Sequence, residues 1–171
     1  MRTFWRWAVL PTILSAATCA AQTGTVTFYT PGNTLKSETA SLLPKSEQPF
    51  TGWLFDGEQR LAHVQRGRFV TFRLAPGEHT FTVPWHPKKP GIDKLVIELA
   101  ASEQHCVRLY AKMTNFEVVP YARLNSQIEE VPCGQVPAEH LKSIDLKRVD
   151  PAVRSELDTA ASFPGVEMDS H

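Results

Sequence analysis

The chain has 171 residues, with 18 basic and 18 acidic side chains and a formal net charge of +0 at pH 7. This length suits one domain with appendages, and the absence of a basic excess argues against a dedicated nucleic-acid binder. Hydrophobic residues make up 42% of the chain and charged residues 21%, a composition that excludes general disorder. We therefore expect a folded domain with a substantial core.

The N-terminal segment, residues 1–21, has the three parts of a secretory signal peptide. Arg2 and Arg6 provide a positive start, residues 7–14 form a short apolar stretch, and small residues fill positions 15–21. The apolar stretch is much shorter than the ~20 residues that a transmembrane helix needs. The competing interpretation, an amphipathic first helix of the mature fold, lacks a polar face at helical spacing. We expect an exported protein, periplasmic or secreted, without a transmembrane span.

Two processing routes compete at the end of this segment. General signal peptidase would cleave before Gln22, after the small residues Cys19 and Ala21. Lipoprotein processing would instead keep an acylated Cys19 as the first residue and anchor the protein to a membrane. That route favours a large aliphatic residue three positions before the cysteine and a small one just before it, where this chain has Ala16 and Thr18. General cleavage is the favoured prediction, and lipidation of Cys19 is the alternative.

Cys106 and Cys133 are the two cysteines that remain once Cys19 is removed or lipidated. An even pair of cysteines in an exported chain is typical of a disulfide. A metal site or a catalytic thiol is the competing interpretation, but neither cysteine has a second Cys or a His at zinc-ligand spacing. We predict a Cys106–Cys133 disulfide that ties the region after the last strand, which is poor in apolar residues, to the sheet.

Side chains alternate between apolar and polar with a period of two from about residue 23 to residue 123, which is the period of β-strands. A long polar loop is expected at residues 33–48. Strands are expected at residues 25–29, 50–55, 61–65, 69–74, 79–83, 94–100, 106–112 and 116–122. Short strands separated by Gly- and Pro-containing turns predict an all-β fold, an antiparallel β-sandwich of seven to eight strands over residues 22–123.

Two turns of this sandwich carry characteristic residues. Asp56-Gly57 favours the positive φ of a tight hairpin, and Pro76-Gly77 fits a β-turn in which Pro presets φ and Gly supplies φ > 0. His79 follows the second turn closely. We expect its ring to hydrogen-bond the turn backbone and to have a structural role.

The C-terminal region, residues 124–166, changes character and is predicted to be a connector followed by one short α-helix. Asp150-Pro151 marks the helix start, with Asp as the N-cap and Pro at the first helical position. About three turns are expected before the chain ends in a disordered tail at residues 167–171.

Residues 53–57 and 67–81 together carry a resemblance to a known family. A strand ending in Asp-Gly, a returning hairpin and a strand ending in Pro-Gly-Glu-His resemble a bacterial envelope domain of unknown function, found in small lipoproteins and exported proteins and similar to PEGA-type β-sandwich modules. The resemblance covers about residues 25–122. It implies a prealbumin-like sandwich in the cell envelope and transfers no active site.

No catalytic signature is present, since the chain lacks G-x-S-x-G, H-E-x-x-H and phosphate-cradling glycine motifs. We therefore predict no catalytic residue, no cofactor and no metal site. A small periplasmic hydrolase or metal-binding protein is the alternative, and His79 with His86 is the pair that could hold a metal.

Trp85, His86 and Lys88 lie together in a proline-containing loop and could form an exposed ledge for a peptide or glycan. The competing interpretation is a Trp that covers one end of the sandwich. Trp53 is expected to be a core or half-buried residue that packs against the facing sheet. The sequence predicts an exported, non-catalytic module with a binding or structural role, whose partner is an envelope protein, a peptide or a glycan.

Overall fold

The computed structural model describes residues 22–32, 47–88, 93–114 and 123–159. The expected signal peptide with Cys19, most of the long loop, the strand expected at residues 116–122 and the expected tail lie outside the described residues.

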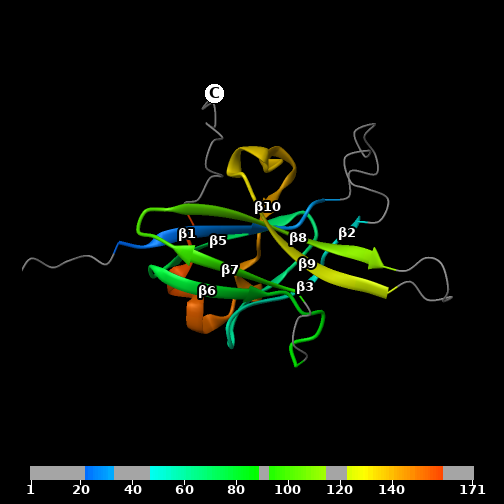
Figure 1. Ribbon diagram of the computed structural model, residues 1–171, viewed down its shortest axis with the longest axis horizontal. Helices are drawn as coiled ribbons and strands as arrows, with labels where there is room; N and C mark the ends of the chain where they lie inside the picture. Colours follow the sequence, from blue (N-terminus) through cyan, green and yellow to red (C-terminus); the bar gives the residue numbers. More distant parts are fainter. Residues whose placement is uncertain (1–21, 33–46, 89–92, 115–122, 160–171) are drawn as a thin grey trace, which may run out of the picture.

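In the described part of the chain ten strands form two packed sheets, which confirms the expected all-β sandwich (Figure 1). The first sheet has the order β10-β5-β1-β8-β2, and β9 also pairs with β8; the second has the order β4-β3-β6-β7. The strands are β1 Gly24–Tyr29, β2 Glu47–Pro49, β3 Gly52–Asp56, β4 Gln59–Val64, β5 Arg68–Leu74, β6 Gly77–Thr82, β7 Lys94–Leu99, β8 Gln104–Thr114, β9 Arg123–Val131 and β10 Lys142–Ser143. Four 3-10 turns follow β9, namely η2 Cys133–Gln135, η3 Ala138–His140, η4 Leu146–Arg148 and η5 Pro151–Glu156.

The expectation of a wholly antiparallel sandwich is corrected by the first sheet. Strand β1 pairs antiparallel with β5 but parallel with β8, and the short β10 pairs parallel with β5. Between β1 and β8 the chain forms all four strands of the second sheet, as well as β2 and β5 of the first. A crossover, and not a hairpin, therefore sets the direction of β8 beside β1, and crossovers allow parallel pairing.

The sandwich extends beyond its expected end at residue 123, because β9 pairs with β8 from Thr114↔Arg123 to Cys106↔Val131. Residues 124–131, which were expected to belong to the connector, are therefore part of an edge strand, and its polar side chains obscure the period of two. The carboxylate of Asp93 accepts a hydrogen bond from the backbone N–H of Ile128 at 3.1 Å. This contact caps a donor that an unpaired strand edge would otherwise expose.

The core lies between the two sheets and follows the predicted alternation. Phe28 from the first sheet meets Phe81 from the second edge to face, with ring centroids 4.8 Å apart. Val70, Phe72 and Leu74 of β5 are buried, as the alternation predicts. The other large, fully buried side chains are Phe50, Leu54, Leu61, Leu99, Leu109, Val26, Val83, Val107 and Val149.

The C-terminal strap, residues 142–158, closes one side of the sandwich (Figure 1, orange). Its Val149 forms a bridge with Ala62 of β4, and its Leu157 forms a bridge with Phe72 of β5. The strap therefore joins an edge of each sheet. Its apolar side chains Ile144, Val149 and Val153 belong to the main core, so the strap docks far more firmly than its composition suggests.

The expected C-terminal α-helix is wrong, because the strap contains only 3-10 turns. Asp150 does cap η5, accepting from the N–H of Ala152 at 3.1 Å, and Pro151 follows it. Hydrogen bonds then run from residue i+3, as from Leu157 N–H to the carbonyl of Arg154. Leu157 itself is extended and paired with β5, so tertiary pairing ends the helical turns after residue 156.

Candidate functional site

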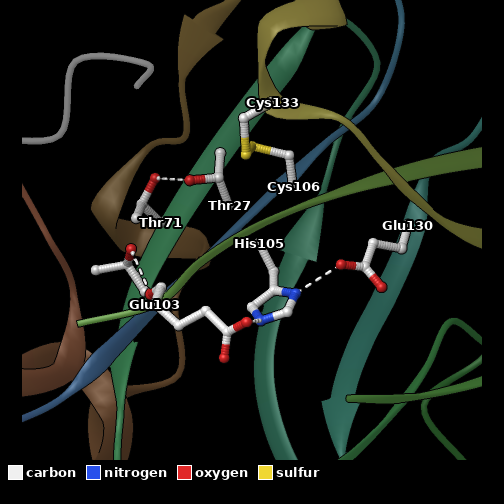
Figure 2. Close-up of a disulfide and its surroundings, with 8 residues drawn as sticks. Thr27, Thr71, Glu103, His105, Cys106, Glu130 and Cys133 are labelled. Atoms are coloured by element: carbon white, nitrogen blue, oxygen red, sulfur yellow. Dashed lines mark hydrogen bonds and ion pairs between the residues drawn. A yellow bond between two sulfur atoms is a disulfide. The ribbon is translucent and has the colours of Figure 1, made fainter. Parts of the chain in front are cut away.

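The structure contains the expected disulfide between Cys106 and Cys133, whose Cα atoms lie 5.1 Å apart (Figure 2). The Cys106 side chain is 1% exposed and packs with Tyr29, apart from the main core that contains Val107 and Leu109. This is the alternation expected for β8. Because both thiols are oxidised, neither cysteine can act as a nucleophile or a metal ligand.

The bridge holds a short lid, residues 133–141, against this part of the first sheet. Val136 and Leu141 of the lid form a small second core with Tyr29 and Cys106. Near the bridge, the buried hydroxyl groups of Thr27 and Thr71 lie 2.8 Å apart and share a hydrogen bond (Figure 2). The disulfide therefore fastens a second layer onto the first sheet.

His105 lies between two carboxylates close to the disulfide (Figure 2). Its Nδ1 is 2.6 Å from Oε1 of Glu130, and its Nε2 is 3.3 Å from Oε1 of Glu103. Burial opposes protonation of His105, but the hydrogen bonds and charges of the two carboxylates outweigh it and raise its pKa. The ion pair joins the start of β8 to the end of β9, in a shallow depression whose lining includes Glu130 and Cys133.

The two predicted turns come together at His79. Its Nδ1 lies 2.6 Å from Oδ2 of Asp56, and its Nε2 donates to the carbonyl of Ala75 at 2.9 Å. Burial lowers the pKa of His79, but the hydrogen bonds to Ala75 and Asp56 raise it by more. Gly57 and Gly77 adopt positive φ values of 53° and 137°. His79 is thus held at both ring nitrogens within a turn.

The predicted ledge of Trp85, His86 and Lys88 is exposed, and its side chains contact nearby parts of the sandwich and of the loop itself. Trp85 is 44% exposed, and its ring packs edge to face on Phe50 with centroids 4.8 Å apart. His86 Nδ1 accepts a hydrogen bond from the backbone N–H of Lys88 at 3.2 Å. Trp85 therefore covers a core phenylalanine, which is the alternative interpretation of this residue. No group of three or more metal-binding side chains occurs among the described residues, so neither His79 nor His86 belongs to such a group.

Aromatic and charged residues that were not predicted to form a site lie together on a different surface. Trp53 of β3 is half-buried, which is one of the two outcomes expected for it. It lies outside the main core between the sheets, because its neighbour Leu54 takes the inward position. Its cross-strand partner is His63 of β4, with ring centroids 4.7 Å apart. The guanidinium of Arg60 lies over the Trp53 ring, 5.2 Å from its centroid. These three side chains form one wall of a groove.

The strap supplies the opposite wall of this groove, which we call the Trp53 groove. It is lined by Trp53, Arg60, His63, Lys147, Arg148, Val149, Asp150 and Pro151 and has a volume of about 250 Å³. Arg148 Nη1 donates to His63 Nδ1 at 2.9 Å, while Arg60 pairs with Asp150 at 2.5 Å.

Two groups of the Trp53 groove have shifted pKa values. Burial and the nearby Arg148 charge lower the pKa of His63, so the neutral ring accepts the Arg148 hydrogen bond. The N–H of Ala152 and the Arg60 side chain lower the pKa of Asp150, which stays ionised. No short motif marks this groove in the sequence, because its walls lie about 90 residues apart along the chain.

The chain matches no family model, and it has no significant match among curated proteins or solved structures. The resemblance to the bacterial envelope domain therefore remains a prediction. Within the described ranges no helix is long and apolar enough to cross a membrane.

Proposed function

We propose that this protein is an exported, non-catalytic β-sandwich module of the bacterial cell envelope with a binding role. The observation that carries the proposal is the Cys106–Cys133 disulfide. Disulfides persist in oxidising compartments such as the periplasm and are rare in the cytosol. The signal-peptide pattern of residues 1–21 and the resemblance to PEGA-type envelope modules support the same compartment.

The non-catalytic part of the proposal is supported by how the reactive side chains are used. Both thiols near the depression are oxidised, and His105 beside them is held between two carboxylates. His79 is engaged at both ring nitrogens, and His63 accepts from Arg148. These arrangements tie strands, turn and strap together and leave the proposed role to surface recognition. Stoichiometric metal in the purified protein, or hydrolase activity, would favour the alternative function instead.

Intact-mass analysis of the protein exported by a bacterial host tests the proposal. We expect a chain that begins at Gln22, with Cys106 and Cys133 unreactive towards thiol reagents in denaturant until a reductant is added. An N-terminal acylated Cys19 would show the lipoprotein route, which keeps the envelope location and adds an anchor. The matched control lacks residues 2–21, stays in the cytosol and should show two free thiols. Free thiols in the exported protein, or retention of the full chain in the cytosol, would contradict the proposal.

A further inference from the structure

The Trp53 groove carries more positive than negative charge. Arg60, Lys147 and Arg148 line it with a single carboxylate, that of Asp150. Both oxygens of Asp150 are engaged, one by Arg60 and the other by a backbone N–H of η5. Arg148 donates to the neutral ring of His63, which does not compensate its charge. In the described part of the chain neither Lys147 nor Arg148 forms an ion pair with a carboxylate, so two positive charges remain available to an anion.

The groove also has an apolar wall, formed by the half-buried Trp53 ring and by Pro151. Aromatic side chains supply a large apolar contact area for the C–H face of a ring, and guanidinium groups pair with carboxylates through charge-assisted hydrogen bonds. The volume of about 250 Å³ lies below the roughly 300–1,000 Å³ of sites for drug-sized ligands. The groove therefore suits one negatively charged ring of a ligand whose remaining parts extend beyond it.

The backbone beside the groove is already paired, which disfavours an extended peptide as the ligand. Asp150 N–H donates to the carbonyl of Leu61 at 2.9 Å, and Val149 forms a bridge with Ala62. The strap thus occupies the edge of β4, where a peptide would otherwise add as a strand through main-chain hydrogen bonds. Recognition here must come from side chains.

We propose that the Trp53 groove binds an acidic saccharide, with the carboxylate of the sugar held by Lys147 and Arg148 and the sugar ring placed against the part of Trp53 that lines the groove beside Arg60. The proposal rests on the binding role proposed above and names the ligand class of that role. The ion pair of Arg60 with Asp150 fixes the strap against β4 and keeps the two walls in register.

Isothermal titration calorimetry of the full, oxidised chain tests this with three probes of similar size. These are trigalacturonic acid, the neutral trisaccharide maltotriose and a triglutamate peptide. We expect binding of trigalacturonic acid that weakens as salt is added, because exposed charge interactions are screened. We expect at least tenfold weaker binding of maltotriose and of triglutamate.

Two variants of the groove should weaken binding of trigalacturonic acid. Lys147→Ala combined with Arg148→Gln removes the proposed carboxylate partners and should weaken binding about tenfold or more, the loss expected for a charge-assisted contact. Trp53→Phe should weaken it by a smaller factor. Lys94→Ala combined with Lys142→Ala is the matched control, since it removes two exposed positive charges outside the groove, and it should leave the affinity unchanged.

Four outcomes would overturn the proposal. They are no binding of trigalacturonic acid by the oxidised chain, equal binding of maltotriose, equal or tighter binding of triglutamate, and equal effects of groove and control variants. The thermal unfolding temperature of each variant separates lost binding from lost folding, and Trp53→Phe keeps an aromatic ring should the double variant fail to fold. A chain that is exported and oxidised but does not bind would overturn this inference and leave the proposed compartment standing.

Discussion

Removal of the Cys106–Cys133 disulfide should destabilise the protein without unfolding the sandwich. The two cysteines are 27 residues apart, and the chain-entropy relation for a loop of this length gives about 3.5 kcal/mol at 25 °C. Small domains commonly have unfolding free energies of about 5–15 kcal/mol, so the variant Cys106→Ser with Cys133→Ser should remain folded. The lid, residues 133–141, should open first, because without the disulfide its contact with the sheet depends on two buried side chains, Val136 and Leu141. The strap should stay closed, since its own side chains lie in the main core.

Urea unfolding of the oxidised protein and the double variant measures the loss of stability, and limited proteolysis with mass analysis locates the first opening. We expect a loss of about 2–4 kcal/mol and first cleavage between residues 132 and 141. Wild-type protein kept reduced is the control and should match the variant. First cleavage within the strap or between core strands would refute the assignment of the bridge to the lid. A loss below about 1 kcal/mol would refute the entropic account of its stabilisation.

Three further changes test local interactions in the sandwich. His79 has a raised pKa, so its contribution to stability is fully present below pH ~6.5 and is lost as the pH rises through the folded-state pKa. The difference in unfolding free energy between wild type and His79→Gln should therefore shrink as the pH rises over that range. A difference that stays constant with pH would contradict this prediction. Gly77→Ala should lower the unfolding free energy by about 1–3 kcal/mol, because φ of Gly77 is 137°. Gly134→Ala should lower it by less than about 0.5 kcal/mol, because no atom lies within 4 Å of the added Cβ. Equal melting temperatures of the two variants would refute this. Thr27→Val or Thr71→Val alone should lower the unfolding free energy by about 1–3 kcal/mol, because each leaves a buried hydroxyl group unpaired. The double variant should be close to neutral in stability. Additive losses in a double-mutant cycle would refute the shared hydrogen bond.

The sequence by itself determined the elements whose signals are local. Alternating side chains placed β5 and the inward positions of β7, because a strand buried on one face needs an apolar residue at every second position. Asp150 and Pro151 marked the start of a helical turn, because capping depends on a residue and its nearest neighbours. The disulfide followed from counting cysteines.

Only the tertiary structure decided which strands and segments pair when they lie far apart in the chain. Strand β9 was not predicted from the sequence, because an edge strand can carry polar side chains on both faces when only part of one face is buried. The 3-10 turns replaced an α-helix because Leu157 finds a pairing partner in Phe72, some 85 residues earlier in the chain. The Trp53 groove exists because the strap closes on β4. Which strand edge is left unpaired is a property of the assembled sheets, and no local period or motif encodes it.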